Sequence, residues 1–155
     1  MKVKIILAVL LFSFNAMAQL PVQVSNNGYK QVESSIAVHP SNSDISAVAT
    51  IELIPTGRQC LIYLSSDNGI NWTLKKSINN ATDPVIEFDN NGNLFFTYLH
   101  RSEFEVYIIK STNLGVTWSV PLKVSNVTGY DEADKEWIVI QGCRGPFLDN
   151  NMLIL

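Results

Sequence analysis

The chain has 155 residues, 46% of them hydrophobic, with 11 basic and 14 acidic residues and a net charge of −3. This length fits one ordinary domain. The acidic balance argues against a nucleic-acid partner, because nucleic-acid binding requires a basic face.

The first 18 residues are predicted to be a secretory signal peptide. Two lysines precede an apolar run at residues 5–14, and residues 16–18 form a small-x-small cleavage site. The run is shorter than the roughly 20 apolar residues of a spanning helix. We therefore expect an exported protein, secreted, periplasmic or at the cell surface, without a membrane span. After cleavage of residues 1–18, nine basic residues stand against 14 acidic ones, a net charge of −5.

Strand signals follow as short β-rich runs separated by polar turns. Helix-forming runs are scarce, so the pattern predicts an all-β chain in which a unit of four strands repeats. The expected strands lie at residues 35–38, 45–53, 60–64 and 72–74, then at 84–88, 94–99, 105–110 and 118–124, and finally at 137–141 and 152–155.

The repeating unit has a regular length. Three acidic residues, Glu33, Asp83 and Asp134, mark the unit starts and are 50 and 51 residues apart. Four strands in about 50 residues match the roughly 40–50-residue period of propeller blades. A β-sandwich with coincidental spacing is the alternative. The expected blades cover about residues 31–79, 80–128 and, incompletely, 129–155.

A short motif occurs between the third and fourth strands of both complete units. Residues 65–72 read SSDNGINW and residues 111–118 read STNLGVTW. The pattern is typical of a self-capped hairpin turn. An Asp or Asn side chain accepts backbone N–H bonds, a glycine adopts a positive φ, and a tryptophan buries a large ring. The structural positions are Ser65, Asp67, Gly69, Trp72, Ser111, Asn113, Gly115 and Trp118.

Both copies resemble the Asp box of the sialidase superfamily, and the surrounding sequence is similar to that of BNR-repeat proteins. Asn113 departs from the pattern, because it keeps an acceptor oxygen but loses the charge. The resemblance implies that residues 19–155 form an incomplete β-propeller of about two and a half four-stranded antiparallel blades. In that superfamily the Asp box serves the fold, so Asp67 is interpreted as structural and not as a catalytic acid.

Propellers close with roughly 4–8 blades. We therefore expect the natural protein to be longer than 155 residues, or its reading frame to be interrupted. The missing remainder of the propeller would then be the first partner of this chain.

The resemblance also implies where a ligand would bind. Links between second and third strands, and from one blade to the next, lie on the face opposite the Asp boxes, and that face binds ligands in the family. Arg58 and Arg101 are candidate ligand-binding residues there and are expected at similar positions in successive units. Glu33, Asp83 and Asp134 are the other candidates. The alternatives are solvated loop residues for the arginines and turn caps for the acids.

Sialidases of the family bind the substrate carboxylate with an arginine cluster, which suits guanidinium because it donates two parallel bonds. Their Phe/Tyr-Arg-Ile-Pro motif is absent here. Catalytic residues are therefore not assigned, and no metal or cofactor motif occurs. We expect the parent protein to be an exported glycoside hydrolase acting on sialylated or other glycans, and this chain alone to be inactive. The alternatives are a non-catalytic propeller that binds glycan or protein at the cell surface, and an inactive truncated remnant.

Two cysteines, Cys60 and Cys143, complete the candidates. In an oxidising compartment they can pair, and two buried free thiols are the alternative.

Overall fold

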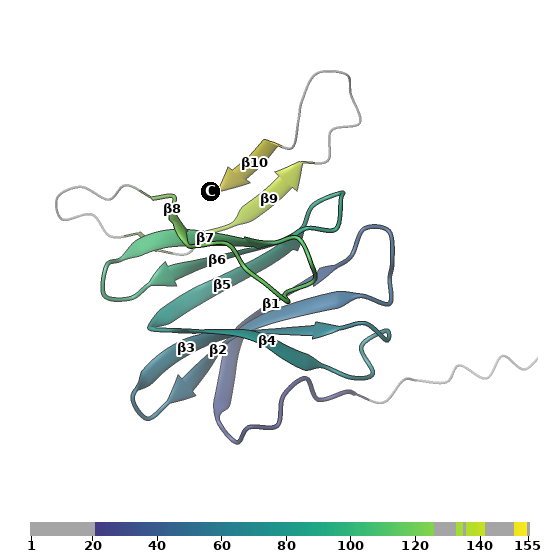
Figure 1. The fold of residues 1–155 in the computed structure, drawn as a ribbon. Helices are drawn as coiled ribbons and strands as arrows, with labels where there is room; N and C mark the ends of the chain where they lie inside the picture. The colour runs from purple at the N-terminus through teal and green to yellow at the C-terminus, as the bar shows by residue number, and fades with distance from the viewer. Residues whose placement is uncertain (1–20, 126–132, 135, 142–150, 155) are drawn as a thin grey trace, which may run out of the picture.

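The computed structural model describes residues 21–125, 133–134, 136–141 and 151–154, and these residues form an all-β protein (Figure 1). Their strands make two four-stranded antiparallel sheets and one two-stranded antiparallel sheet. The all-β prediction and the unit of four strands are confirmed, and each unit is one sheet. Within the described residues no helix has the length and apolarity to cross a membrane.

Each four-stranded sheet follows the order of the chain, with every strand hydrogen-bonded to the next. The first sheet consists of β1 (Lys30–Val38), β2 (Ser46–Ile54), β3 (Gly57–Ser65) and β4 (Thr73–Asn79). The second consists of β5 (Ala81–Phe88), β6 (Leu94–His100), β7 (Glu105–Ser111) and β8 (Leu122–Lys123). The third pairs β9 (Ile138–Gln141) with β10 (Asn151–Ile154).

The strand β8 is much shorter than the predicted run of residues 118–124. The backbone N–H of Ser119 donates to the Lys110 carbonyl at 2.9 Å, but the Lys110 N–H donates to Ser119 Oγ at 3.0 Å. A side-chain oxygen thus replaces the backbone acceptor of a regular ladder. Pro121 follows and has no N–H to donate. Regular pairing with β7 is therefore limited to Leu122 and Lys123.

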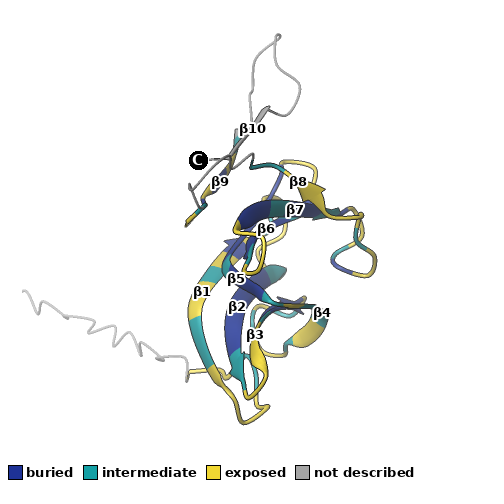
Figure 2. Cartoon of the chain, turned by 90° about the vertical axis from the view of Figure 1, so that its left-hand side faces the viewer, coloured by how far each residue is buried: buried dark blue, intermediate teal, exposed yellow. Residues whose placement is uncertain are grey.

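The two large sheets pack face to face around a shared core (Figure 2). Strand β5 lies against β1, β2 and β3 of the first sheet. Burial of each large aliphatic or aromatic side chain stabilises the fold by roughly 1.5–3 kcal/mol. Core residues from both sheets include Ala49, Ile51, Ile62, Ile86, Phe96 and Ile109.

A smaller cluster covers the opposite face of the second sheet. Val85 and Ile108 are buried there against Ile138 of β9, with Phe95 and Ile140 packed beside them. The second sheet is therefore covered on both faces. This burial explains why the middle strand β6 is apolar almost throughout instead of alternating with polar residues.

The turns alternate between two ends of the sheets. At one end the Asn68 N–H donates to the Asp44 carbonyl at 2.9 Å and joins the β1–β2 and β3–β4 turns. At the other end the Asn80 N–H donates to the Arg58 carbonyl, and the Arg101 N–H donates to the Asn80 carbonyl, each at 2.9 Å. Arg58 and Arg101 therefore lie at the end opposite the two motif turns.

Candidate functional site

The turn at residues 65–72 is held by its own side chains. The Ser65 hydroxyl donates to Asp67 Oδ1 at 2.8 Å and accepts the Gly69 N–H at 2.9 Å. Asp67 also accepts the backbone and side-chain N–H groups of Asn71 at 2.8 and 2.6 Å. These hydrogen bonds, those from Asn71 foremost, hold the pKa of the Asp67 carboxyl below its ordinary value. The side chain of Trp72 donates to the Gly69 carbonyl at 3.0 Å and closes the turn.

The turn at residues 111–118 repeats this network. The Ser111 hydroxyl donates to Asn113 Oδ1 at 3.0 Å and accepts the Gly115 N–H at 2.8 Å. Asn113 Oδ1 accepts the Thr117 N–H at 2.9 Å, and Trp118 Nε1 donates to the Gly115 carbonyl at 3.2 Å. In both turns, called the capped turns below, the polar groups of the shared pattern form hydrogen bonds within the turn itself. In this geometry the side chains of Asp67 and Asn113 stabilise the turns.

A third self-capped turn joins β5 to β6 and was not predicted as such. Asp89 is 2% exposed and accepts the N–H groups of Asn91 and Asn93 at 2.9 and 2.8 Å. Asn93 Nδ2 adds a bond at 2.7 Å. The signal for this turn in the sequence is the aspartate immediately before Asn90, at the residue that opens the turn.

Glu33 and Asp83, the acidic residues at the starts of the first two units, occupy equivalent backbone positions. Each lies at a β-bulge, where the register of β1 with β2 and of β5 with β6 shifts. Their φ angles are +53° and +51°, in the left-handed region that L-residues with a Cβ rarely adopt. Asp134 is exposed and precedes β9. The predicted repeat therefore has a physical basis in the first two units, namely an extra residue near the start of the first strand of each sheet.

Strands β1 and β5 lie beside each other, and residues at and after their bulges line a groove of about 450 Å³. The Ile86 N–H donates to Ser35 Oγ at 3.2 Å and ties the two strands together across the sheets. Trp137, 57% exposed, closes one side. This inner groove is lined by Glu33, Ser34, Ser35, Ile36, Pro84, Val85 and Trp137.

The charges around the inner groove act on one buried thiol. Cys60 in β3 is fully buried, and burial is the largest cause that raises the pKa of its thiol. The charges of Glu136, Asp83 and Glu33 raise it further, in that order. The thiol is therefore affected by two of the three predicted acids and by Glu136, which the sequence does not single out.

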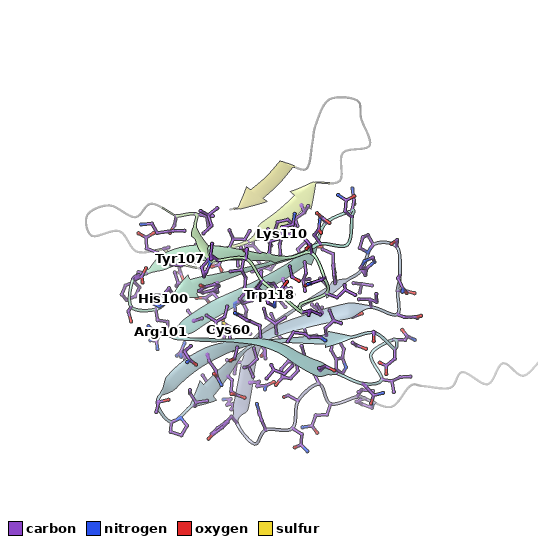
Figure 3. All side chains as sticks on the ribbon, in the orientation of Figure 1. Cys60, His100, Arg101, Tyr107, Lys110 and Trp118 are labelled. Atoms are coloured by element: carbon purple, nitrogen blue, oxygen red, sulfur yellow. The ribbon has the colours of Figure 1, made fainter. Side chains whose placement is uncertain are left out.

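The two candidate arginines lie at the same end of successive sheets, but at different points of the β2–β3 and β6–β7 hairpins. Arg58 lies within β3 and pairs with Leu53, whereas Arg101 belongs to the turn after β6. Both side chains are exposed, and neither is among the described residues that line the inner groove. Figure 3 shows Arg101 beside His100 at the end of the second sheet. The arginine cluster implied by the resemblance is therefore not assembled from these two residues.

A tyrosine, a glutamate and a histidine meet near Arg101. The Tyr107 hydroxyl donates to Glu103 Oε2, and His100 Nδ1 lies 3.3 Å from Glu103 Oε1. The hydrogen bond to Glu103 is the main cause that raises the pKa of Tyr107 to about 12. A phenol that stays protonated at neutral pH is the opposite of an activated nucleophile. The sequence does not reveal this cluster, because its members lie on a strand end, a turn and a neighbouring strand.

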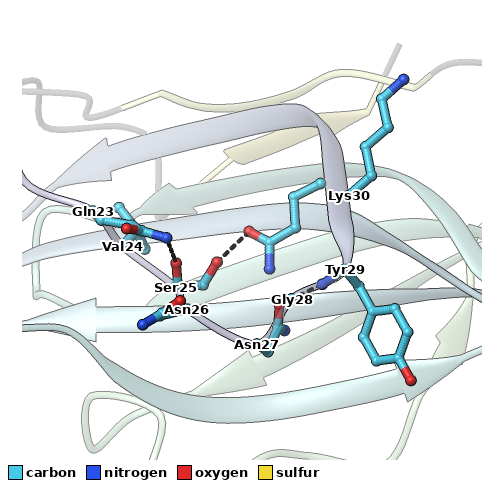
Figure 4. Close-up of a pocket in the computed structure, with 9 residues that line it drawn as sticks. Gln23, Val24, Ser25, Asn26, Asn27, Gly28, Tyr29 and Lys30 are labelled. Carbon is cyan, nitrogen blue, oxygen red and sulfur yellow. Dashed lines mark hydrogen bonds between the residues drawn. The ribbon is translucent and has the colours of Figure 1, made fainter.

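A second hollow, of about 620 Å³, is lined by residues 23–31 before and within β1 (Figure 4). Beside it, the carboxylate of Glu52 is 2% exposed and accepts the side-chain amides of Asn27, Gln31 and Gln59, the last at 2.5 Å. Three amide donors compensate the desolvation of this buried charge. The arrangement fixes the segment before β1 to the first sheet.

The two cysteines and the possibility of a metal site remain to be considered. Cys60 is a free thiol, and Cys143 lies outside the described residues, as does the loop at residues 126–132. Within the described part of the chain, His, Cys, Asp and Glu side chains form no group able to hold a metal ion.

Comparison with known proteins identifies no family for this chain, since no family model matches it and no curated protein matches it significantly. The fold and its geometry define the class: an all-β protein with two four-stranded antiparallel sheets packed face to face.

Proposed function

We propose that this chain forms two blades, and part of a third, of an exported Asp-box propeller of the sialidase type, and that this propeller binds glycans. The observation that supports the propeller is repetition. Each four-stranded sheet carries the same capped turn after its third strand and the same bulge near the start of its first strand. Sheets that repeat in this way and stack face to face are the units from which a propeller is built.

The inner groove supports the choice of glycan as ligand. Its volume of about 450 Å³ is in the range of roughly 300–1,000 Å³ that ligand pockets occupy. It combines the exposed ring of Trp137 with the Glu33 carboxylate and two serines. An aromatic face packs against the apolar side of a sugar ring, while carboxylate and hydroxyl groups accept bonds from sugar hydroxyls.

Binding without hydrolysis is the activity that the geometry of this chain supports best. Neither Arg58 nor Arg101 lines the inner groove, and Tyr107, the tyrosine paired with a glutamate, holds its proton. Hydrolysis by the parent protein follows from the resemblance alone, since a shared fold does not fix a function.

The test is to probe the purified 155-residue protein on a glycan array and with a fluorogenic sialoside. We expect binding to at least one glycan and no turnover. Trp137→Ala should abolish the binding, whereas Tyr29→Ala should leave it unchanged, because Tyr29 is a comparably exposed aromatic residue outside the inner groove. Turnover of the sialoside would establish a hydrolase instead, and a protein that binds no glycan would refute the proposal.

A further inference from the structure

Three asparagines of the chain stand directly before a glycine, namely Asn27, Asn68 and Asn91. An asparagine in this position can modify itself without an enzyme, because glycine lacks the Cβ that would hinder the approach of its backbone nitrogen to the asparagine side chain. The nitrogen gives up its proton and bonds to Cγ, and the side-chain amide leaves as ammonia. Water then opens the succinimide ring to aspartate or to isoaspartate.

In two of the three pairs the glycine nitrogen is held by a hydrogen bond inside a turn. The Gly69 N–H donates to Ser65 Oγ at 2.9 Å, within the first capped turn. The Gly92 N–H donates to the Asp89 carbonyl at 2.9 Å, within the β5–β6 turn. A nitrogen whose hydrogen is held in this way keeps its proton and its direction, so both turns oppose ring closure.

The third pair, Asn27 and Gly28, lacks this restraint. The Gly28 N–H has no hydrogen-bond acceptor among the described residues, and no atom lies within 4 Å of the point where a Cβ would be. The Tyr29 backbone N–H donates to Asn27 Oδ1 at 3.4 Å (Figure 4). A donor at this oxygen stabilises the negative charge that develops when Cγ is attacked, as in an oxyanion hole. The pair therefore combines an unheld nucleophile with a polarised carbonyl.

Modification of Asn27 would alter a buried contact. Its side-chain amide donates to the carboxylate of Glu52, which is 2% exposed. Gln31 and Gln59 supply the other amide donors. Conversion of Asn27 removes one donor and places a second carboxylate beside Glu52, where burial and like charge both disfavour it. The contact between residues 21–29 and the first sheet is thereby weakened.

We propose that Asn27 is a site of self-modification, which converts to aspartate or isoaspartate before Asn68 and Asn91 and then releases the segment before β1 from the first sheet. The reaction consumes only water and expels ammonia, so the release is slow and irreversible. It involves none of the residues that line the inner groove. The inference therefore stands or falls independently of glycan binding.

The experiment ages the full 155-residue protein at 37 °C and mildly alkaline pH, and follows each asparagine by peptide mapping with mass spectrometry. We expect the peptide that contains Asn27 to be modified first, while Asn68 and Asn91 stay intact as long as the protein is folded. In concentrated urea the turn hydrogen bonds are lost, so the rates of the three sites should draw together. Equal rates in the folded protein, or earlier modification of Asn68 or Asn91, would overturn the proposal.

Variants test the release of the segment. Asn27→Asp mimics one product and should be cut by trypsin after Lys30 faster than the fresh unmodified chain, because a loosened segment is more open to proteolysis. The matched control is Asn68→Asp, in a turn held by other side chains, which should leave this cleavage unchanged. Asn27→Gln keeps an amide but lengthens the side chain, so the Asn27 reaction should disappear from the map.

The outcomes separate the chemistry from its consequence. Cleavage of Asn27→Asp at the rate of the unmodified chain would refute the release, even if Asn27 is modified first. The same comparison can be made on aged and fresh fractions of the unmodified chain, separated by charge, so the inference stays testable if Asn27→Asp fails to fold.

Discussion

Substitution of Gly92 by alanine tests the packing of the two large sheets. Gly92 lies in the β5–β6 turn with a φ of +77°, and a Cβ there would lie 2.2 Å from His39 Nε2 in the β1–β2 turn. His39 packs edge-on against Phe88, with ring centroids 5.2 Å apart. Gly92→Ala must therefore displace a side chain that belongs to the other sheet.

Gly69 provides the matched control. Its φ is +78°, but a Cβ there would approach nothing closer than Trp72 at 3.7 Å. Gly69→Ala therefore isolates the cost of the left-handed backbone, about 1–2 kcal/mol. Gly92→Ala adds the loss of the His39–Phe88 contact, about 0.5–1.5 kcal/mol. We expect Gly92→Ala to lower the free energy of unfolding by about 1.5–3.5 kcal/mol.

Urea unfolding followed by tryptophan fluorescence measures these differences. The double variant His39→Ala/Gly92→Ala removes the clash, so the cost of Gly92→Ala should fall to that of Gly69→Ala in the His39→Ala background. Equal losses for Gly92→Ala and Gly69→Ala, or no coupling with His39, would show that the two turns do not touch in solution. The face-to-face arrangement of the sheets would then be wrong.

Three further predictions concern single side chains. Ser111→Ala should cost about 1–3 kcal/mol of unfolding free energy in urea titrations, because the Ser111 hydroxyl is buried and the Gly115 N–H loses its acceptor; a loss within experimental error would contradict the capping network. The Asp67 carboxyl has a lowered pKa in the fold, so its contribution to stability is present above the unfolded pKa of about 3.9 and is lost as the pH falls through the lower folded value. Asp67→Asn should therefore be less stable than the unmodified chain at neutral pH, with a gap that narrows on acidification below about pH 4, and a gap independent of pH would contradict the assigned hydrogen bonds. In a Cys143→Ser background, Cys60 should react with a thiol reagent at pH 8 only as fast as the chain unfolds, because burial and nearby carboxylates raise its pKa; rapid labelling of the native protein would show that Cys60 is accessible.

The sequence by itself determined the local structure. The capped turns were predictable because every group in each network lies within eight consecutive residues, so the turn geometry follows from short-range hydrogen bonding and a glycine with positive φ. The strands and the unit of four were predictable for a similar reason, since β-rich runs and turn residues alternate at a regular period. The bulges at Glu33 and Asp83 could be inferred only from the regular spacing of these acidic residues. Their positive φ angles could not be predicted, because neither residue is a glycine, the residue type that normally signals this backbone conformation.

Arg58 and Arg101 lie at different points of their hairpins because the two turns differ in length. Two residues, Pro55 and Thr56, link β2 to β3, whereas residues 101–104 link β6 to β7. Two arginines at matching places in the repeat therefore differ in position along their hairpins, one inside a strand and one beyond the end of a strand. Hairpin register, which sets these positions, is fixed by pairing between strands and not by either strand alone.

Only the tertiary structure decided where the inner groove lies and which residues line it. Glu33, Pro84 and Trp137 belong to three units that are distant in sequence, and they meet because β1, β5 and β9 stack side by side when the sheets bury their apolar faces. The sequence contains the residue types of this site but not their juxtaposition, since face-to-face packing is driven by non-directional burial spread over many residues. That packing makes Glu33, which read along the chain resembles a turn cap, part of the lining of a groove.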